Sequence, residues 1–274
     1  GGTVAKALRA IDRWAAPAAR AAVVEASGMV ASHGDLDLVG RWASITKLVT
    51  ALAVLRAVEA HRIDLDEAAG PPGATVRHLL AHASGLPFDG RDPIARPGTR
   101  RIYSNPGYDL LGALLEVRHG RPIGDVLTIE VLAALDLADS RLVGRPSQGI
   151  DGSLRDAAAF AQELLRSTLI SRALLASATS VAFPGLAGVL PSIGRFDPLD
   201  WGLGFEIRDG KSPHWTGTRN SPATFGHFGG SGTFLWVDPV LDRTLVCLTD
   251  RDFGPWALEA WPSFSDAVIA ALSA

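Results

Sequence analysis

The stretch Ser44-Ile-Thr-Lys-Leu-Val-Thr-Ala-Leu-Ala-Val-Leu-Arg-Ala-Val-Glu-Ala60 predicts the element around which the chain folds. Its leucines, valines and alanines would occupy nearly every face of a helix over 45–60, which is typical of a helix inside a protein. Ser44 stands where this helix would begin, and a buried helix that begins at a serine is unusual. The stretch is therefore both the expected core helix and the first place to look for chemistry.

The residues before this stretch predict a helix followed by a β-hairpin. Val4 to Ala19 is rich in alanine, with apolar residues at roughly helical spacing. Ala21-Ala-Val-Val-Glu25 and Leu36-Asp-Leu-Val39 read as strands on either side of a turn at His33-Gly34-Asp35. We therefore expect two strands before the core helix.

The residues from about 63 to 191 are dominated by helical segments separated by proline and glycine turns, and strand character is nearly absent there. The uncharged stretch Ala173 to Gly194 is long enough to span a bilayer, but its prolines, glycines and serines favour a surface or cleft-lining connection. The predicted helices are Val76 to His82, Gly107 to His119, Ile123 to Ala134 and Leu154 to Ser167.

Strand character returns at Trp201 to Ile207, Gly232 to Val237 and Arg243 to Thr249, and a closing helix is predicted over Trp256 to Ala274. Strands at both ends with helices between predict an α/β (α+β) protein. One domain would comprise 1–62 plus 192–274, and an inserted, mainly helical domain would comprise 63–191. We expect the functional cleft between the two domains.

The amino-acid composition and charge of the chain argue against several classes of function. A formal net charge of -3 and a pI near 6.2 give no positive field, so we expect no nucleic-acid partner and no stable membrane insertion. One cysteine permits no intrachain disulfide and no multi-cysteine metal site. The single cysteine and the absence of a signal sequence favour a cytoplasmic location, while Gly1-Gly2 leaves open a secreted form whose signal has been removed. A small-molecule substrate fits best, and monomer is the simplest oligomeric state.

Ser44 and Lys47 are the first candidate pair. Residues three apart on a helix share a face, so Lys47 could bring its amine to the Ser44 hydroxyl. A serine hydroxyl needs a neighbouring base, and a lysine serves if its amine is neutral. The alternative is that Ser44 merely caps the helix. With 19 serines and three lysines, roughly 0.2 chance matches to S-x-x-K are expected, so the pair is only suggestive alone.

Tyr103-Ser-Asn105 is the second candidate. The chain has two tyrosines and two asparagines, so a chance Y-x-N match has an expectation of only about 0.015. A tyrosine aimed at Ser44 and Lys47 could relay protons, and an asparagine amide could orient a substrate carbonyl. The alternative is an Asn-Pro turn beside a core tyrosine.

The third candidate is the glycine-dense stretch Phe225-Gly-His-Phe-Gly-Gly-Ser-Gly-Thr-Phe-Leu-Trp236. Its glycines would let a substrate lie against the backbone and pair with an edge strand. The N–H near Gly230 could complete an oxyanion hole with that of Ser44. His227 would stand at the rim of the cleft. The alternative is a plain turn between strands.

In order and spacing, Ser44-x-x-Lys47, Tyr103-x-Asn105 and His227-x-Gly229 together resemble the serine β-lactamase-like, or penicillin-recognising, superfamily. The class C-like branch, with its β-lactamases, DD-peptidases, amidases and esterases, is the most similar. Leu79-Leu-Ala-His-Ala-Ser-Gly-Leu-Pro87 and Trp201-Gly-Leu-Gly-Phe205 resemble two further family segments, so the resemblance runs from about residue 20 to the C-terminus.

The resemblance implies a β-lactamase/transpeptidase-like fold, with an antiparallel sheet flanked by helices, and an acyl-enzyme mechanism without a cofactor. Ser44 would attack a carbonyl while Lys47 and Tyr103 together manage its proton. The N–H groups of Ser44 and Gly230 would hold the oxyanion, and Asn105 would position the substrate.

The third motif departs from the K-T-G that is frequent in this superfamily, because it reads His227-Phe228-Gly229. His227 would carry charge only part of the time near neutral pH, and Phe228 has no hydroxyl, which weakens binding of a substrate carboxylate. We therefore expect a small neutral ester, lactone or amide. Arg219 could restore carboxylate binding, so a β-lactamase or DD-peptidase is the first alternative and a non-catalytic penicillin-binding-like ligand sensor is the second.

Two further expectations concern specificity and metals. Loops over Asp89 to Arg100 and Phe183 to Pro198 should carry substrate specificity. His78 and His82 lie four apart, but no glutamate follows His78 as a zinc protease helix requires, so no metal site is expected.

Overall fold

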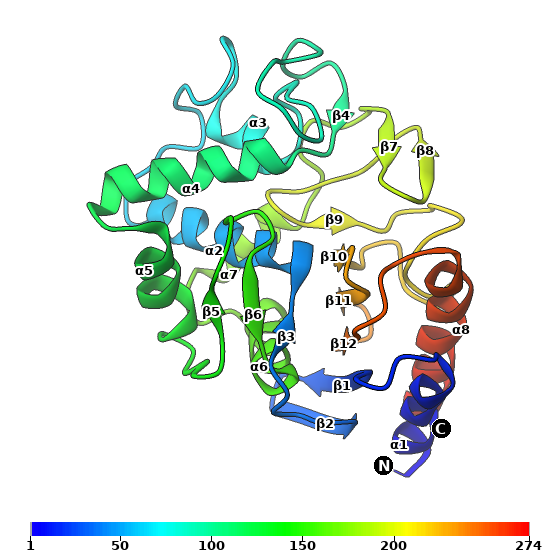
Figure 1. The fold of residues 1–274 in the computed structure, drawn as a ribbon. Helices are drawn as coiled ribbons and strands as arrows, with labels where there is room; N and C mark the ends of the chain where they lie inside the picture. The colour runs from blue at the N-terminus through cyan, green and yellow to red at the C-terminus, as the bar shows by residue number, and fades with distance from the viewer. Residues whose placement is uncertain (1, 274) are drawn as a thin grey trace.

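A computed structural model describes residues 2–273. Its centre is a six-stranded sheet in the order β2-β1-β12-β11-β10-β9, with every neighbouring pair antiparallel (Figure 1). The chain therefore has the antiparallel sheet that the resemblance implied. Its strands are β1 (Arg20–Glu25), β2 (Gly28–His33), β9 (Glu206–Ile207), β10 (Phe225–Gly229), β11 (Thr233–Asp238) and β12 (Arg243–Leu248).

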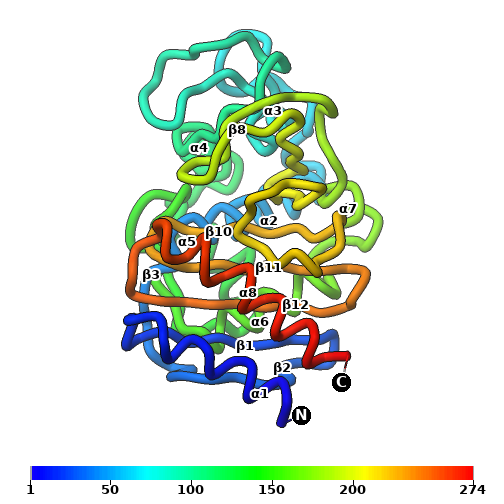
Figure 2. Tube along the Cα trace, turned by 90° about the vertical axis from the view of Figure 1, so that its right-hand side faces the viewer, coloured from blue at the N-terminus to red at the C-terminus, as the bar shows by residue number. Residues whose placement is uncertain are grey.

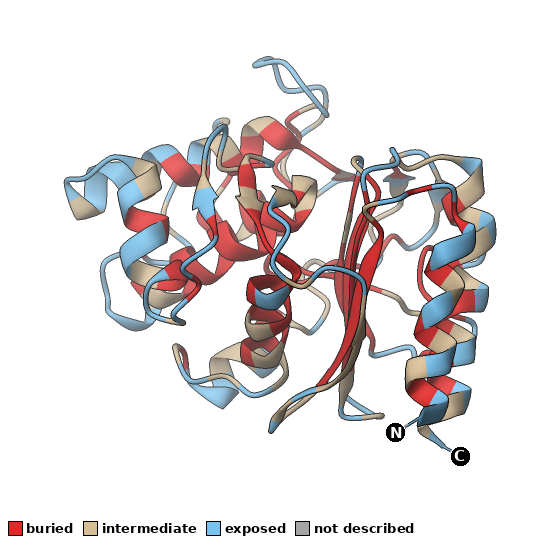
Figure 3. Ribbon diagram, turned by 60° about the horizontal axis from the view of Figure 1, so that its bottom comes forward, coloured by how far each residue is buried: buried red, intermediate tan, exposed pale blue. Residues whose placement is uncertain are grey.

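Helices cover both faces of this sheet, which explains why β11 is buried along its whole length. On one face lie α1 (Gly2–Leu8) and α8 (Pro255–Leu272), which run side by side in Figure 2. On the other face lies α6 (Leu154–Leu165), which packs on β12, β1 and β11. Figure 3 shows the buried strands as a red layer between helices. Two apolar cores result, one on each side of the sheet.

The predicted core helix is α2 (Thr46–Glu59), and buried residues lie on every face of this helix. It begins one residue later than predicted, because Ala43–Ile45 forms a short 3-10 turn, η2, which leads into it. Ser44 therefore lies in the turn and Lys47 in the first turn of α2. The Ala43 backbone has φ 50°, a left-handed conformation that is costly for a residue with a side chain.

The segment between β2 and β9 holds the other helices, as predicted, and α7, which lies where a connection was predicted. It also holds strands that the sequence did not indicate, in two three-stranded sheets, β3-β6-β5 and β4-β7-β8. These strands are two or three residues long, too short to show a periodic pattern. The helices are α3 (Val76–Leu80), α4 (Asn105–His119), α5 (Ile123–Leu127) with its π-helical extension η3 (Thr128–Leu132), α6 and α7 (Arg172–Ala178); the strands are β3 (Gly40–Arg41), β4 (Arg101–Ile102), β5 (Arg141–Leu142), β6 (Ile150–Gly152), β7 (Gly188–Leu190) and β8 (Gly194–Phe196).

The predicted hairpin exists, but its turn was misplaced. The strand β2 pairs with β1 around a tight turn before Gly28, whose φ of 130° favours glycine, and residues 36–39 form no strand. Of the strand predicted over Trp201 to Ile207, only the last two residues form β9. Gly204 interrupts it, because the backbone bends there with φ 110° in close contact with Ala51 of α2. The division into domains at residues 62 and 191 stays a prediction.

Candidate active site

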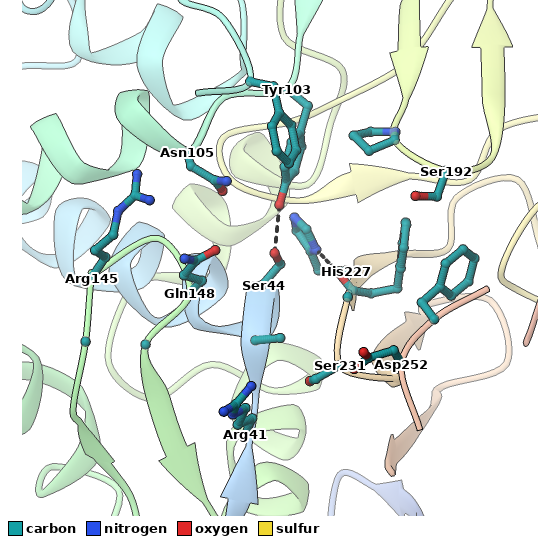
Figure 4. A pocket seen from close by; sticks show the side chains of 18 of the residues that line it. Arg41, Ser44, Tyr103, Asn105, Arg145, Gln148, Ser192, His227, Ser231 and Asp252 are labelled. Atoms are coloured by element: carbon teal, nitrogen blue, oxygen red, sulfur yellow. Dashed lines mark hydrogen bonds between the residues drawn. The ribbon is translucent and has the colours of Figure 1, made fainter. Parts of the chain in front are cut away.

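A cleft of about 820 Å³ opens where η2, the start of α4 and β10 meet (Figure 4). Five of the seven predicted site residues line it, Lys47 lies buried beneath its floor, and Gly229 lies beside Ser44. The lining residues are Arg41, Ala43, Ser44, Phe88, Tyr103, Asn105, Val143, Gly144, Arg145, Gln148, Gly149, Asp151, Leu190, Pro191, Ser192, His227, Phe228, Gly230, Ser231, Asp252 and Phe253.

Ser44 contacts two side chains, one from the distant Tyr103 and one from Lys47 in the first turn of α2. The Tyr103 hydroxyl donates to the Ser44 Oγ at 2.9 Å, and the Lys47 Nζ lies 3.5 Å from the same oxygen. Figure 4 shows the Tyr103 ring pointing down at Ser44 from above the cleft. A serine hydroxyl between a phenol and an amine has the groups needed to move its proton.

Lys47 is fully buried, and its amine has three neighbours. The Nζ donates to the Asn105 Oδ1 at 2.6 Å and to the Ser147 carbonyl at 3.0 Å, and its third direction faces Ser44. Burial lowers the pKa of Lys47 to about 7, since a charged amine loses its hydration there. A neutral amine has two hydrogens and one lone pair. Because the two oxygens accept the two hydrogens, the lone pair is left facing Ser44.

The Tyr103 ring packs among other aromatic rings. His82 and Trp201 pack against it at centroid distances of 4.7 and 5.8 Å, and Phe88 stacks on it at 5.8 Å. The Lys47 Nζ lies over its ring, 4.5 Å from the centroid. Burial raises the pKa of Tyr103 well above its usual value, so the phenol keeps its proton at neutral pH.

Asn105 is the first residue of α4, which Ser104 caps by accepting a hydrogen bond from the Gly107 N–H. The cap fixes where the helix begins and so where the Asn105 side chain points. Its oxygen binds Lys47, and the residue also lines the cleft. Asn105 therefore positions the amine, in addition to any contact with substrate.

Two backbone N–H groups are free at the cleft. Within residues 2–273, neither the Ser44 N–H nor the Gly230 N–H donates a hydrogen bond. A Cβ added to Gly229 would lie 2.8 Å from the Ala43 Cβ and 3.1 Å from the Ser44 nitrogen, so β10 can approach η2 this closely only with glycine at 229. Two such donors could stabilise an oxyanion.

His227 is buried between Tyr103 and Trp201, at ring-centroid distances of 5.6 and 5.7 Å. Its Nδ1 lies 2.6 Å from the Phe228 carbonyl, which can only accept, so Nδ1 carries the hydrogen. Burial, reinforced by the charge of Lys47 when its amine is protonated, lowers the pKa of His227 to about 3. The expectation of a partial charge near neutral pH was wrong, because the ring is out of water.

Two neighbours of the site, Ser147 and His82, were not predicted as site residues from the sequence. Ser147 contributes a backbone carbonyl, which leaves no mark on residue type. His82 holds Tyr103 by stacking and accepts the Ser104 N–H at its Nδ1. Arg219 does not line the cleft, and the arginines that do are Arg41 and Arg145. Of the two predicted specificity loops, only the second reaches the main cleft, through Leu190, Pro191 and Ser192.

The histidine pair at 78 and 82 has other partners. The His78 Nδ1 accepts the Thr75 N–H in a capping box. No group of three or more possible metal ligands occurs within residues 2–273. Over the same residues, no helix is both long and apolar enough to cross a bilayer.

Known proteins resemble this chain in sequence and in fold. The sequence profile of the family described as Beta-lactamase matches residues 9–264. A crystal structure of a beta-lactamase from Mycobacterium bovis is 50% identical, with a TM-score of 0.96, and the match covers 98% of this chain and all of that one. Simvastatin synthase from Aspergillus terreus shares the fold, with a TM-score of 0.78 at 18% identity over 98% of this chain and 94% of that one.

One curated protein is similar to this chain over part of its length. A protein of Escherichia coli (strain K12), described as a candidate D-alanyl-D-alanine carboxypeptidase, is 25% identical over 210 residues, which cover 59% of this chain. The match covers 48% of that protein, so this chain spans about half the length of that relative.

Proposed function

Because the chain belongs to the beta-lactamase family, as its motifs predicted, we propose that it is a serine hydrolase that forms an acyl-enzyme at Ser44. The observation that carries this proposal is the contact of the Ser44 hydroxyl with both the Tyr103 hydroxyl and the buried amine of Lys47, whose pKa is lowered to about 7. A helix cap needs neither group. The pairing of a buried amine with a partly exposed serine at the cleft is an arrangement that activates a serine hydroxyl.

In the proposed acylation step, the Ser44 Oγ forms a bond to the substrate carbonyl carbon while its proton moves to the Lys47 lone pair. Tyr103 donates a hydrogen bond to the Ser44 oxygen and keeps it oriented. The carbonyl oxygen becomes an oxyanion held by the N–H groups of Ser44 and Gly230. The bond to the leaving group then breaks, and the proton passes from Lys47 to the departing atom.

In the deacylation step, a water molecule attacks the acyl carbon and gives its proton to Lys47. The tetrahedral intermediate collapses, the Ser44 Oγ leaves and takes the proton back, and the acid product is released. The amine thus begins and ends the cycle neutral. This role requires a lysine pKa near the working pH, which burial supplies.

The proposed substrate is a small ester or amide with an apolar group. Phe228 and Phe253 lie 4.6 Å apart by ring centroids and form an apolar wall with Leu190 and Pro191. The uncharged His227 offers no cation to a substrate carboxylate. Polar side chains, Asn105 and Gln148 among them, line the opposite side of Ser44 (Figure 4).

A β-lactamase or DD-peptidase is the second candidate. The observation in its favour is the 50% identity, along nearly the whole chain, to a protein described as a beta-lactamase. Against it stands the neutral His227 in place of a permanent cation. Turnover of a chromogenic cephalosporin faster than of a nitrophenyl ester would favour this candidate.

The test of the proposed function is turnover of a short-chain nitrophenyl ester by the wild type and by Ser44→Ala. We expect loss of activity to the background rate in the variant, whereas unimpaired turnover would refute the assignment of Ser44. Acylation without turnover in the wild type would instead indicate a ligand sensor.

A further inference from the structure

The strand β10 presents an open edge to the cleft. On its outer side it pairs with β9 only at Phe225 and Gly226, so the residues from His227 onward have no strand beside them. The turn bond from the Gly232 N–H to the Gly229 carbonyl shows that Gly229 points its backbone groups toward β11. Successive residues of a strand point to opposite edges, so Phe228 points its backbone groups away from β11. Gly230 is the first residue of the turn after the strand, and it lines the cleft.

The two carbonyls on this edge are already occupied. The Phe228 carbonyl accepts the His227 Nδ1–H at 2.6 Å. The Gly230 carbonyl accepts the Phe253 N–H at 2.9 Å. The His227 ring is enclosed by Tyr103 and Trp201 and cannot swing away without displacing them. The edge therefore offers N–H donors to a ligand, while both of its acceptors are in use.

A peptide bound along this edge would need those acceptors. In a hydrogen-bonded antiparallel pair, two facing residues exchange both bonds, N–H to C=O and C=O to N–H. A substrate carbonyl that accepts from the Gly230 N–H thus places the N–H of the same residue opposite the Gly230 carbonyl. That carbonyl is bound to Phe253, so the substrate N–H would lose water without gaining a full partner.

We infer that the site selects acyl groups that lack an N–H next to the reacting carbonyl, that is, simple or hydroxy-acid esters and lactones over peptides and N-acylamino acids. This inference rests on the proposed function and deepens it. Since a carbonyl has a second lone pair, the selection is a matter of several-fold preference and not of exclusion. The sequence predicted that a substrate pairs with this strand. On this proposal, only the N–H donors of the strand edge are available for that pairing.

The test uses two nitrophenyl esters that differ only in N–H against O, those of N-acetylalanine and O-acetyllactic acid, each as both enantiomers. Each kcat/KM is divided by the hydroxide-catalysed rate of the same ester. We expect the wild type to prefer the lactyl ester by about threefold or more, because an unpaired buried donor carries a cost. A smaller ratio, or a preference for the alanyl ester, overturns the inference.

A matched pair of variants isolates the backbone bond. Phe253→Pro removes the N–H that occupies the Gly230 carbonyl, and Phe253→Ala removes the same ring but keeps the N–H. We expect the lactyl-to-alanyl ratio to fall at least about threefold in Phe253→Pro relative to Phe253→Ala. An equal ratio in two folded variants contradicts the inference. If Phe253→Pro does not fold, the wild-type ratio decides alone.

Labelling of Ser44 with a fluorophosphonate separates this test from the proposed function. A wild type that is labelled at Ser44 but prefers the alanyl ester overturns only the selectivity. A wild type that is not labelled and turns over neither ester overturns the proposed function itself.

Discussion

The Nζ atom of Lys47 lies 3.5 Å from the Oγ atom of Ser44, and its other two directions are taken by the Asn105 side-chain oxygen and the Ser147 carbonyl. The two acceptors fix the amine so that a neutral Lys47 has its lone pair on the serine side. The Tyr103 hydroxyl donates a hydrogen bond to the same serine oxygen. Tyr103 keeps its proton, because burial raises the pKa of its phenol. The geometry thus favours Lys47 as proton acceptor and Tyr103 as donor.

The first prediction concerns pH. Since Lys47 must be neutral to accept a proton and burial lowers its pKa to about 7, kcat/KM should be constant above about pH 7. Below that pH it should fall, approaching tenfold per pH unit, as the amine takes up a proton. Ester turnover measured from pH 5 to 9 checks this. A profile that stays flat down to pH 5 would exclude Lys47 as the base.

The second prediction tests the link between Asn105 and Lys47. Asn105→Asp would place a carboxylate at the position of the oxygen 2.6 Å from the Nζ, and an adjacent negative charge raises the pKa of an amine. The acidic limb of the profile should move up by at least about one pH unit, with activity recovering at high pH. Asn105→Ala, which adds no charge, is the control. An unmoved limb in Asn105→Asp would count against Lys47.

The third prediction separates Tyr103 from Lys47. Tyr103→Phe removes the hydrogen bond to Ser44 but keeps the aromatic packing, so we expect kcat for the ester to fall by about 10² or more with the variant still folded. The residual activity should keep the acidic limb near pH 7, because Lys47 still accepts the proton. Loss of that limb would instead make Tyr103 the base.

The long helices and strands and several site residues could be predicted from the sequence, because each leaves a clear pattern in it. The core helix, the strands β1, β11 and β12 and the closing helix α8 are long and have clear apolar patterns. The site residues of types that are rare in this chain, such as Tyr103 and Lys47, stood out at motif spacing. The roles assigned to them stay predictions.

Other features could not be predicted because they depend on backbone groups and three-dimensional enclosure. Ser147 acts through its carbonyl, and Phe253 through its N–H, so neither side chain signals its part. The loss of charge at His227 follows from burial among Tyr103 and Trp201, which no local pattern contains. The short strands β3 and β4 exist only through pairing with the distant strands β6 and β7, and the local pairs β5–β6 and β7–β8 are too short to show a pattern.

The fourth prediction concerns the close approach of β10 to η2. Gly229→Ala would put a methyl group 2.8 Å from the Ala43 Cβ and 3.1 Å from the Ser44 nitrogen, so one of the two segments must shift. We expect kcat to fall by about 10² with a lower thermal midpoint, because an oxyanion donor is displaced. Gly230→Ala, whose Cβ would meet no atom within 4 Å, should keep the wild-type midpoint. Full activity in Gly229→Ala would contradict the proposed oxyanion site.

The most direct test of the central claim is to quench turnover of a slowly hydrolysed ester with acid and measure the intact mass and the peptide map. We expect an added mass equal to the acyl group, located on the peptide that contains Ser44 and absent from Ser44→Ala. An acyl group on another residue, or unimpaired turnover in Ser44→Ala, would contradict it.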